Sequence, residues 1–102
     1  MNEFVVNLRG QCETVESIAV KIERGDAYMD DVKAYLPTLN ETIQTLFGYM
    51  QQPEMNLDIS PDFIMQVLSD IVYGIEHEDS VYLLDVLRYG LIELYHYIEL
   101  EL

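Results

Sequence analysis

The sequence predicts an all-α protein, specifically an antiparallel four-helix bundle with up-down-up-down topology. Two observations favour this fold: apolar residues recur at steps of three and four along four segments, and residues that commonly start or stop helices bound those segments. In addition, half of the 102 residues are hydrophobic, which favours a folded chain. A chain of this length buries one hydrophobic core, so residues 1–102 are expected to form a single domain.

The first helix is predicted over residues 3–24. Its apolar face consists of Leu8, Cys12, Val15, Ala19 and Ile22, with Phe4 and Val5 leading into it. Glycine readily adopts the left-handed conformation that follows many helices, so Gly25 is expected to end this one.

The second helix is predicted over residues 27–51, with Asp26 as its N-cap. Its apolar face consists of Met29, Val32, Leu36, Leu39, Ile43, Leu46 and Met50. Pro37 falls inside the helix but off the apolar face, and we expect the helix to bend there around the core.

Residues 52–60 lack a sustained period and are predicted to form the one long loop, beginning beside the helix-stopping Pro53. Ser60, Pro61 and Asp62 then supply an N-cap hydroxyl, a proline for the first helical position and an early carboxylate. The third helix is predicted over residues 61–77. Its apolar face consists of Ile64, Val67, Leu68, Ile71, Val72 and Ile75.

The fourth helix is predicted over residues 79–101, with Asp79 as its N-cap. Its apolar face consists of Leu84, Leu87, Leu91, Leu94 and Ile98. The turns on either side of the long loop are short, so each pair of helices is expected to be antiparallel. A three-helix arrangement and a swapped dimer of hairpins are the alternatives.

The fourth helix has a second apolar and aromatic face, almost opposite the first. It consists of Tyr82, Val86, Tyr89, Tyr97 and Leu100. Tyrosine is enriched in protein interfaces, so this face is a candidate interface with a protein partner or a second copy of the chain. The alternative interpretation is that this helix is the most central element of its own fold.

The charge balance restricts the kinds of partner. The chain has 19 acidic residues and 5 basic ones, for a formal net charge of −14. Such a surface repels nucleic acid and anionic membrane and favours basic protein partners, although it also serves plain solubility. The single cysteine, Cys12, excludes an intrachain disulfide, and we expect no secretion signal and no membrane span, so a bacterial cytoplasmic location is predicted.

Few residues indicate catalysis or metal binding. Glu93 and His96 have the Glu-x-x-His spacing of di-iron bundles, but a second copy and two inward carboxylates are missing. His77 lies among acidic residues at a predicted turn, where cap and solvation roles explain them. Catalytic triads, phosphate-binding glycine loops and paired cysteine motifs are absent from the sequence, so we predict no catalytic residue, no cofactor and no metal ligand.

The segment from Tyr73 to Tyr89 has a helix, an acidic turn and a helix rich in tyrosine and leucine. This segment resembles small acidic helical proteins of Gram-positive bacteria, some of them encoded near motility genes. The whole chain also resembles flagellar-type export chaperones, which hold helices of a partner protein. The resemblance implies a helical bundle that binds protein, and it implies no functional residues.

The sequence therefore predicts a non-enzymatic protein-protein interaction module, similar to an adaptor or chaperone. Two alternatives stay open. One is an enzyme or metal protein that uses His77 or His96 with nearby carboxylates. The other is an acidic mimic of nucleic acid that blocks a basic cleft.

Overall fold

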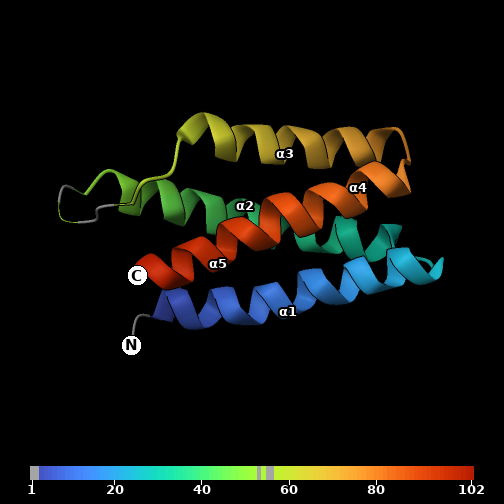
Figure 1. Ribbon diagram of the computed structural model, residues 1–102, viewed down its shortest axis with the longest axis horizontal. Helices are drawn as coiled ribbons and strands as arrows, with labels where there is room; N and C mark the ends of the chain where they lie inside the picture. Colours follow the sequence, from blue (N-terminus) through green and yellow to red (C-terminus); the bar gives the residue numbers. More distant parts are fainter. Residues whose placement is uncertain (1–2, 53, 55–56) are drawn as a thin grey trace.

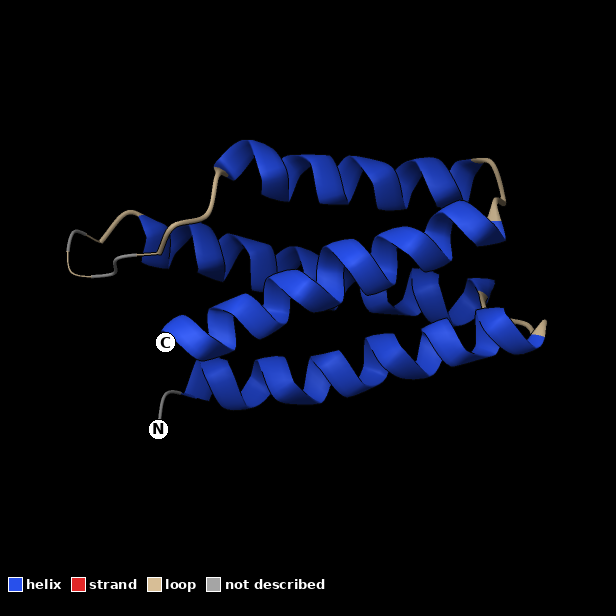
Figure 2. Ribbon diagram, in the orientation of Figure 1, coloured by secondary structure: helices blue, strands red, loops and turns tan. Residues whose placement is uncertain are grey.

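The computed structural model describes residues 3–52, 54 and 57–102, and within these ranges it contains helices and no strands (Figures 1 and 2). The helices are α1 (Glu3–Arg24), α2 (Met29–Met50), α3 (Pro61–Glu76), α4 (Ser80–Val86), the π-helix η1 (Leu87–Leu91) and α5 (Ile92–Glu101). The last three are continuous and are called together the C-terminal helix. The all-α four-helix prediction is confirmed, with boundaries within two residues of those expected.

The four helices lie side by side along the long axis of the molecule. In Figure 1 the C-terminal helix lies between α1 and α3, and α2 lies behind it. Successive helices run in opposite directions, so that both chain ends lie at the same end of the bundle. The predicted loop over residues 52–60 includes Pro53, Met55 and Asn56, which lie outside the described residues.

The turn chemistry predicted at three of the four helix boundaries is confirmed. Gly25 has a φ of +76° and ends α1. The Ser60 side chain accepts a hydrogen bond from the Asp62 N–H at 3.2 Å, and Asp79 Oδ1 accepts one from the Tyr82 N–H at 3.0 Å. These side chains satisfy backbone donors that the first turns of α3 and α4 leave unpaired.

The prediction that Asp26 caps α2 is wrong. Tyr28 occupies the N-cap position of α2 and makes no side-chain cap bond. The Gly25 N–H donates to the Ile22 carbonyl at 3.1 Å, and the Asp26 N–H donates to the Lys21 carbonyl at 2.9 Å. This bond pair is the Schellman arrangement that closes a helix end. Asp26 therefore belongs to the end of α1 rather than to the start of α2.

The buried apolar side chains form one cluster to which all four helices contribute. Every residue of the predicted α1 face is buried, whereas Met29, Leu36 and Met50 of α2 are only partly buried. Val72 of α3 was predicted to be in the core, yet it is 47% exposed. The buried residues of α3 are Ile64, Val67, Ile71 and Gly74, so its inward arc is narrower than its apolar stripe and excludes Val72.

The C-terminal helix differs most from its prediction, because its middle turn is the π-helix η1. Before η1 the buried residues include Leu83 and Val86, and after it they include Leu94 and Tyr95. The wider π turn adds about one residue and so rotates the inward face by about 100°. For this reason Val86 is buried rather than outward, and Leu84 is only partly buried.

Gly74 allows α3 and α4 to approach closely. An ideal Cβ at Gly74 would lie 3.2 Å from Leu83 Cβ and 3.3 Å from Leu83 Cα. Both contacts are tighter than ordinary van der Waals packing, and one of them is to backbone. The hairpin formed by α3 and α4 therefore depends on the missing side chain.

We expect Gly74→Ala to lower the free energy of unfolding by about 1 kcal/mol, because the overlap with Leu83 outweighs the better helix propensity of alanine. The matched control is Gly10→Ala, where a Cβ meets nothing within 4 Å. That change should raise stability by about 0.5–1 kcal/mol. Urea denaturation monitored by circular dichroism measures both, and a stabilising effect at Gly74 would contradict the close approach.

A cluster of hydrogen-bonded polar side chains crosses the core. Tyr35 Oη donates to Gln11 Oε1 at 2.7 Å and lies 2.7 Å from Tyr95 Oη. Thr42 Oγ1 lies 2.9 Å from the same Gln11 oxygen and 2.9 Å from the Thr38 carbonyl. These contacts join α1, α2 and α5, and Gln11 and Thr42 are each only 5% exposed.

Candidate functional site

The five residues of the predicted interface do not share one exposed face. Tyr89 and Leu100 are 67% and 85% exposed, whereas Val86 is buried. Tyr97 Oη accepts the Asp58 N–H at 3.1 Å, so Tyr97 holds the chain before α3 against α5. Tyr82 also bonds within the protein. Only part of the predicted surface is therefore exposed, because Val86 is buried and Tyr97 is bonded to the chain before α3.

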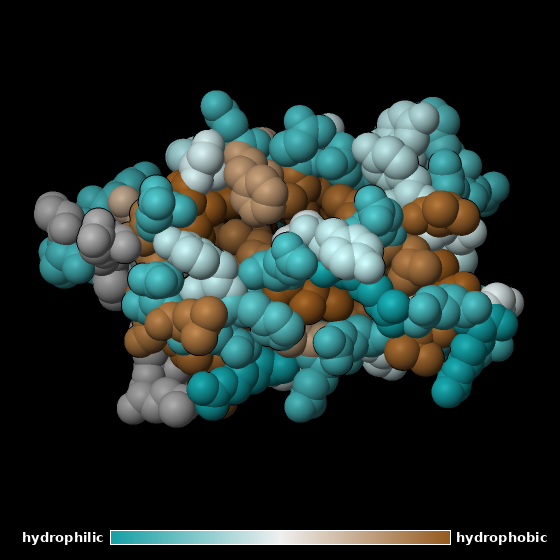
Figure 3. All heavy atoms as spheres, viewed as in Figure 1, coloured by the Kyte–Doolittle hydropathy of each residue, from teal (hydrophilic) through white to brown (hydrophobic). Residues whose placement is uncertain are grey.

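A groove between α3 and the C-terminal helix contains three of these five residues. Buried Val67, Val86 and Gly90 line it together with exposed Phe63, Tyr82 and Tyr89. The groove has a volume of about 260 Å³. Figure 3 views the molecule from this side and shows hydrophobic side chains between α3 and the C-terminal helix. We call this feature the α3 groove.

Phe63 extends the apolar surface beyond the α3 groove. It is 45% exposed, and it also lines a second hollow of about 270 Å³ with Ile59, Leu94 and Tyr97. The two hollows follow one another along the seam between α3 and the C-terminal helix. Such a succession of apolar positions suits a helix that presents side chains one turn apart.

The wall of the α3 groove is held in place by internal bonds. Asp70 Oδ1 accepts hydrogen bonds from Tyr82 Oη and from Gln66 Nε2, both at 2.8 Å. The hydrogen bond to Asp70 raises the pKa of Tyr82 above its ordinary value. The Tyr82 ring lies 4.7 Å from that of Tyr73, between ring centroids. A wall fixed in this way loses little side-chain freedom when a partner binds.

The surroundings of the groove are acidic. Asp70 and Asp85 line the α3 groove, and Asp58 and Glu93 line the second hollow. The described lining residues of both hollows include no lysine or arginine. Arg88 is near, but it is paired with Glu23. The apolar seam is therefore bordered by carboxylates that carry no basic partner of their own within the seam.

The residues of the enzyme and metal alternative lie apart. His77 is exposed, stacks on the Tyr73 ring at 4.0 Å between centroids and has its Nδ1 3.0 Å from the Tyr73 carbonyl. His96 is also exposed. Among the residues the structure describes, no three His, Cys, Asp or Glu side chains are grouped to hold a metal ion.

The single cysteine, Cys12, is buried in α1. Burial raises the pKa of the Cys12 thiol to about 11, with Glu99 and Glu16 adding to the effect.

Sequence reasoning missed Phe63 as a site residue. Its position, one residue before the inward Ile64, marked it only as lying off the apolar stripe of α3. An exposed aromatic residue next to a helix start is a weak signal by itself. Its meaning depends on the neighbouring helix, which brings Tyr89 to the same groove.

Comparisons with known proteins did not identify a family for this chain. No family model matches the chain, and neither the search of curated proteins nor the search of solved structures gave a match. Within the described residues, every helix is too short or too polar to cross a membrane. The function is therefore argued from the surface itself.

Proposed function

We propose that the protein is a non-enzymatic interaction module that binds a basic amphipathic helix of a partner protein along the seam between α3 and the C-terminal helix. The observation that carries this proposal is the α3 groove, where exposed Phe63 and Tyr89 flank a buried apolar floor. Aromatic residues beside a small pocket are the side chains that most often dominate binding energy. The role resembles that of an adaptor or a chaperone for helical segments.

Charge favours a basic partner over a second copy of the chain. Each copy has a formal net charge of −14, and pairing through this face would bring Asp70 and Asp85 against acidic residues of the other copy. Like charges placed together at an interface oppose association. A helix with lysine or arginine beside its apolar anchors would instead meet Asp58, Asp70, Asp85 or Glu93. Its affinity should fall as salt is added.

The test combines cross-linking with a pair of matched variants. A photoreactive p-benzoylphenylalanine in place of Tyr89 captures neighbours in the native host, and mass spectrometry identifies the linked segment. A synthetic peptide of that segment is then titrated against the protein. We expect Phe63→Ser with Tyr89→Ser to weaken peptide binding at least about 10-fold, since each aromatic anchor contributes on the order of 1 kcal/mol or more.

The control is Val6→Ser with Val20→Ser, which removes two exposed apolar side chains from α1 instead. It should bind the peptide as the unmodified protein does. Equal affinities for all three proteins, or a linked segment without basic residues, would contradict the proposal. Light scattering provides a further check, because a dimer that the groove variant dissociates would identify a second copy as the occupant.

A further inference from the structure

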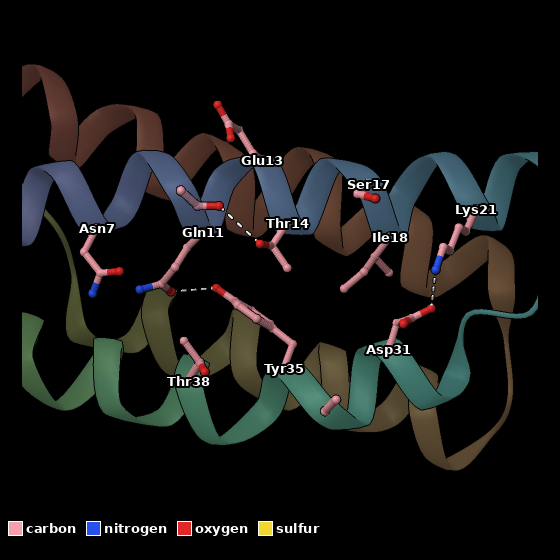
Figure 4. A pocket seen from close by; sticks show the side chains of 12 residues that line it. Asn7, Gln11, Glu13, Thr14, Ser17, Ile18, Lys21, Asp31, Tyr35 and Thr38 are labelled. Carbon is pink, nitrogen blue, oxygen red and sulfur yellow. Dashed lines mark hydrogen bonds and ion pairs between the residues drawn. The ribbon is translucent and has the colours of Figure 1, made fainter.

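A separate hollow lies between α1 and α2 and shares no lining residue with the α3 groove or with the hollow beside Phe63. Its volume is about 690 Å³. Short side chains on the two helices leave the space open: Gly10, Thr14 and Ser17 on α1, and Ala34 and Thr38 on α2. Figure 4 shows the two helices on either side of it, with Gln11 and Tyr35 between them. We call this hollow the α1–α2 cleft.

Gln11 gives the cleft a specific chemical feature. Its side chain is 5% exposed, and its Oε1 is 2.7 Å from Tyr35 Oη, 2.9 Å from Thr42 Oγ1 and 3.3 Å from Tyr95 Oη. Its Nε2 is buried and has no hydrogen-bond partner among the described residues. In Figure 4 this nitrogen points away from Tyr35, toward the side of Asn7.

An amide nitrogen that is buried without an acceptor destabilises the protein, since it has lost its hydrogen bonds to water. The three hydroxyl groups cannot supply an acceptor for it, because all of them lie on the oxygen side of the amide. Within the described chain this nitrogen is left without an acceptor, and a bound molecule could supply one. Asn7 is exposed and borders the cleft on that side, so displacement of its side chain opens a route to Nε2.

From these contacts we infer that the α1–α2 cleft binds a small neutral molecule whose carbonyl oxygen accepts a hydrogen bond from Gln11 Nε2. A carbonyl oxygen only accepts, which is what this donor lacks. Lys21 and Asp31 pair with each other at 2.8 Å at one end of the cleft, and Glu13 adds a further carboxylate to its lining. An anion is therefore repelled. Ile18 and Ala34 provide apolar contact for the rest of the molecule.

The probe is 2-pyrrolidone, a neutral ring with one amide carbonyl, titrated into ¹⁵N-labelled protein and followed by NMR. We expect saturable shifts of the Gln11 side-chain NH₂ signals and of the Gly10, Ala34 and Thr38 amides. For so small a probe the Kd should be on the order of millimolar. Cyclopentane, which has no acceptor, and acetate, which is anionic, should not produce these shifts.

Two glycine variants locate the binding site. A Cβ at Gly10 and one at Gly48 each meet nothing within 4 Å, but only Gly10 borders the cleft. Gly10→Leu should fill the cleft and weaken 2-pyrrolidone binding at least about 10-fold, a loss of about 1.4 kcal/mol, while Gly48→Leu should leave it unchanged. Circular dichroism of both variants serves as the check that they are folded. Linear, non-saturating shifts, or equal binding by both variants, would overturn the inference without affecting the proposed helix binding.

Discussion

Tyr95→Ala is expected to lower the free energy of unfolding by about 4 kcal/mol. Tyr95 is 0% exposed and is the largest of the fully buried side chains. Its removal leaves a cavity at the junction of α5 with the core, and it also takes a hydrogen-bond partner from Tyr35. Since domains of this size are stable by only about 5–15 kcal/mol, the variant should unfold at a much lower urea concentration.

Two variants separate packing from hydrogen bonding and from general effects of tyrosine removal. Tyr95→Phe keeps the ring and removes only the hydroxyl, so it should cost about 1 kcal/mol. Tyr89→Ala removes a tyrosine that is 67% exposed and should change stability by less than about 0.5 kcal/mol. The prediction fails if Tyr95→Ala and Tyr89→Ala have similar effects on the urea midpoint.

Alkaline pH is expected to destabilise the protein steeply. Burial raises the pKa of Tyr35 to about 12, partly offset by its hydrogen bond to Tyr95, and burial with the nearby Tyr35 raises the pKa of Tyr95 further still. Tyrosine in the unfolded chain ionises near pH 10. Between about pH 10 and 12 the folded state therefore holds two protons that the unfolded state has lost. The stability that these two phenols contribute is full below pH 10 and then falls by roughly 3 kcal/mol per pH unit.

The buried thiol of Cys12 should start the decline slightly earlier. Its pKa is raised from 9.0 to about 11, so its contribution is lost as pH rises above about 9. Urea denaturation at a series of pH values measures the whole curve. Tyr35→Phe removes one of the two buried phenols and should lower the slope above pH 10 by roughly 1 kcal/mol per pH unit. An unchanged slope in this variant would show that Tyr35 ionises equally easily in both states.

The helices could be predicted from sequence because their signals are local. The α1 face, from Phe4 to Ile22, is buried as its spacing predicts. Ser60 and Asp79 cap helices because a short polar side chain can reach the nearest backbone donors. Asp26 has the same chemistry, but it belongs to the closing turn of α1, and α2 begins three residues later at Met29. The sequence pattern does not distinguish these two outcomes at a short turn.

The hydrogen-bonded polar side chains in the core could not be predicted from the sequence pattern. Gln11, Tyr35 and Tyr95 come from three helices, and the contact between Gln11 and Tyr95 joins residues 84 positions apart. A hydropathy pattern assigns glutamine and threonine to the surface. Only the arrangement of the helices shows that these groups satisfy one another. The unpartnered Gln11 nitrogen could not be inferred from the sequence for the same reason, because its surroundings depend on the helix arrangement.

The candidate interface was partly predictable. Tyr89 is outward, as a helical wheel indicates, but the wheel assumes a regular helix and so misplaced Val86. The second wall of the groove comes from Phe63, which lies on a different helix, α3. A surface built by two helices requires their relative position, which the spacing of apolar residues within each helix does not contain.

The π turn at Leu87–Leu91 also bears on how the chain tolerates changes in length. Removing a residue from a regular buried helix turns everything beyond it by about 100° and points core side chains at solvent. Here the turn already contains about one residue more than an α-helix would use. Loss of an outward residue such as Tyr89 would convert this turn to a regular one and leave Leu83 and Tyr95 facing inward. The middle of the last helix is thus the place where the bundle can shorten by one residue and keep its core.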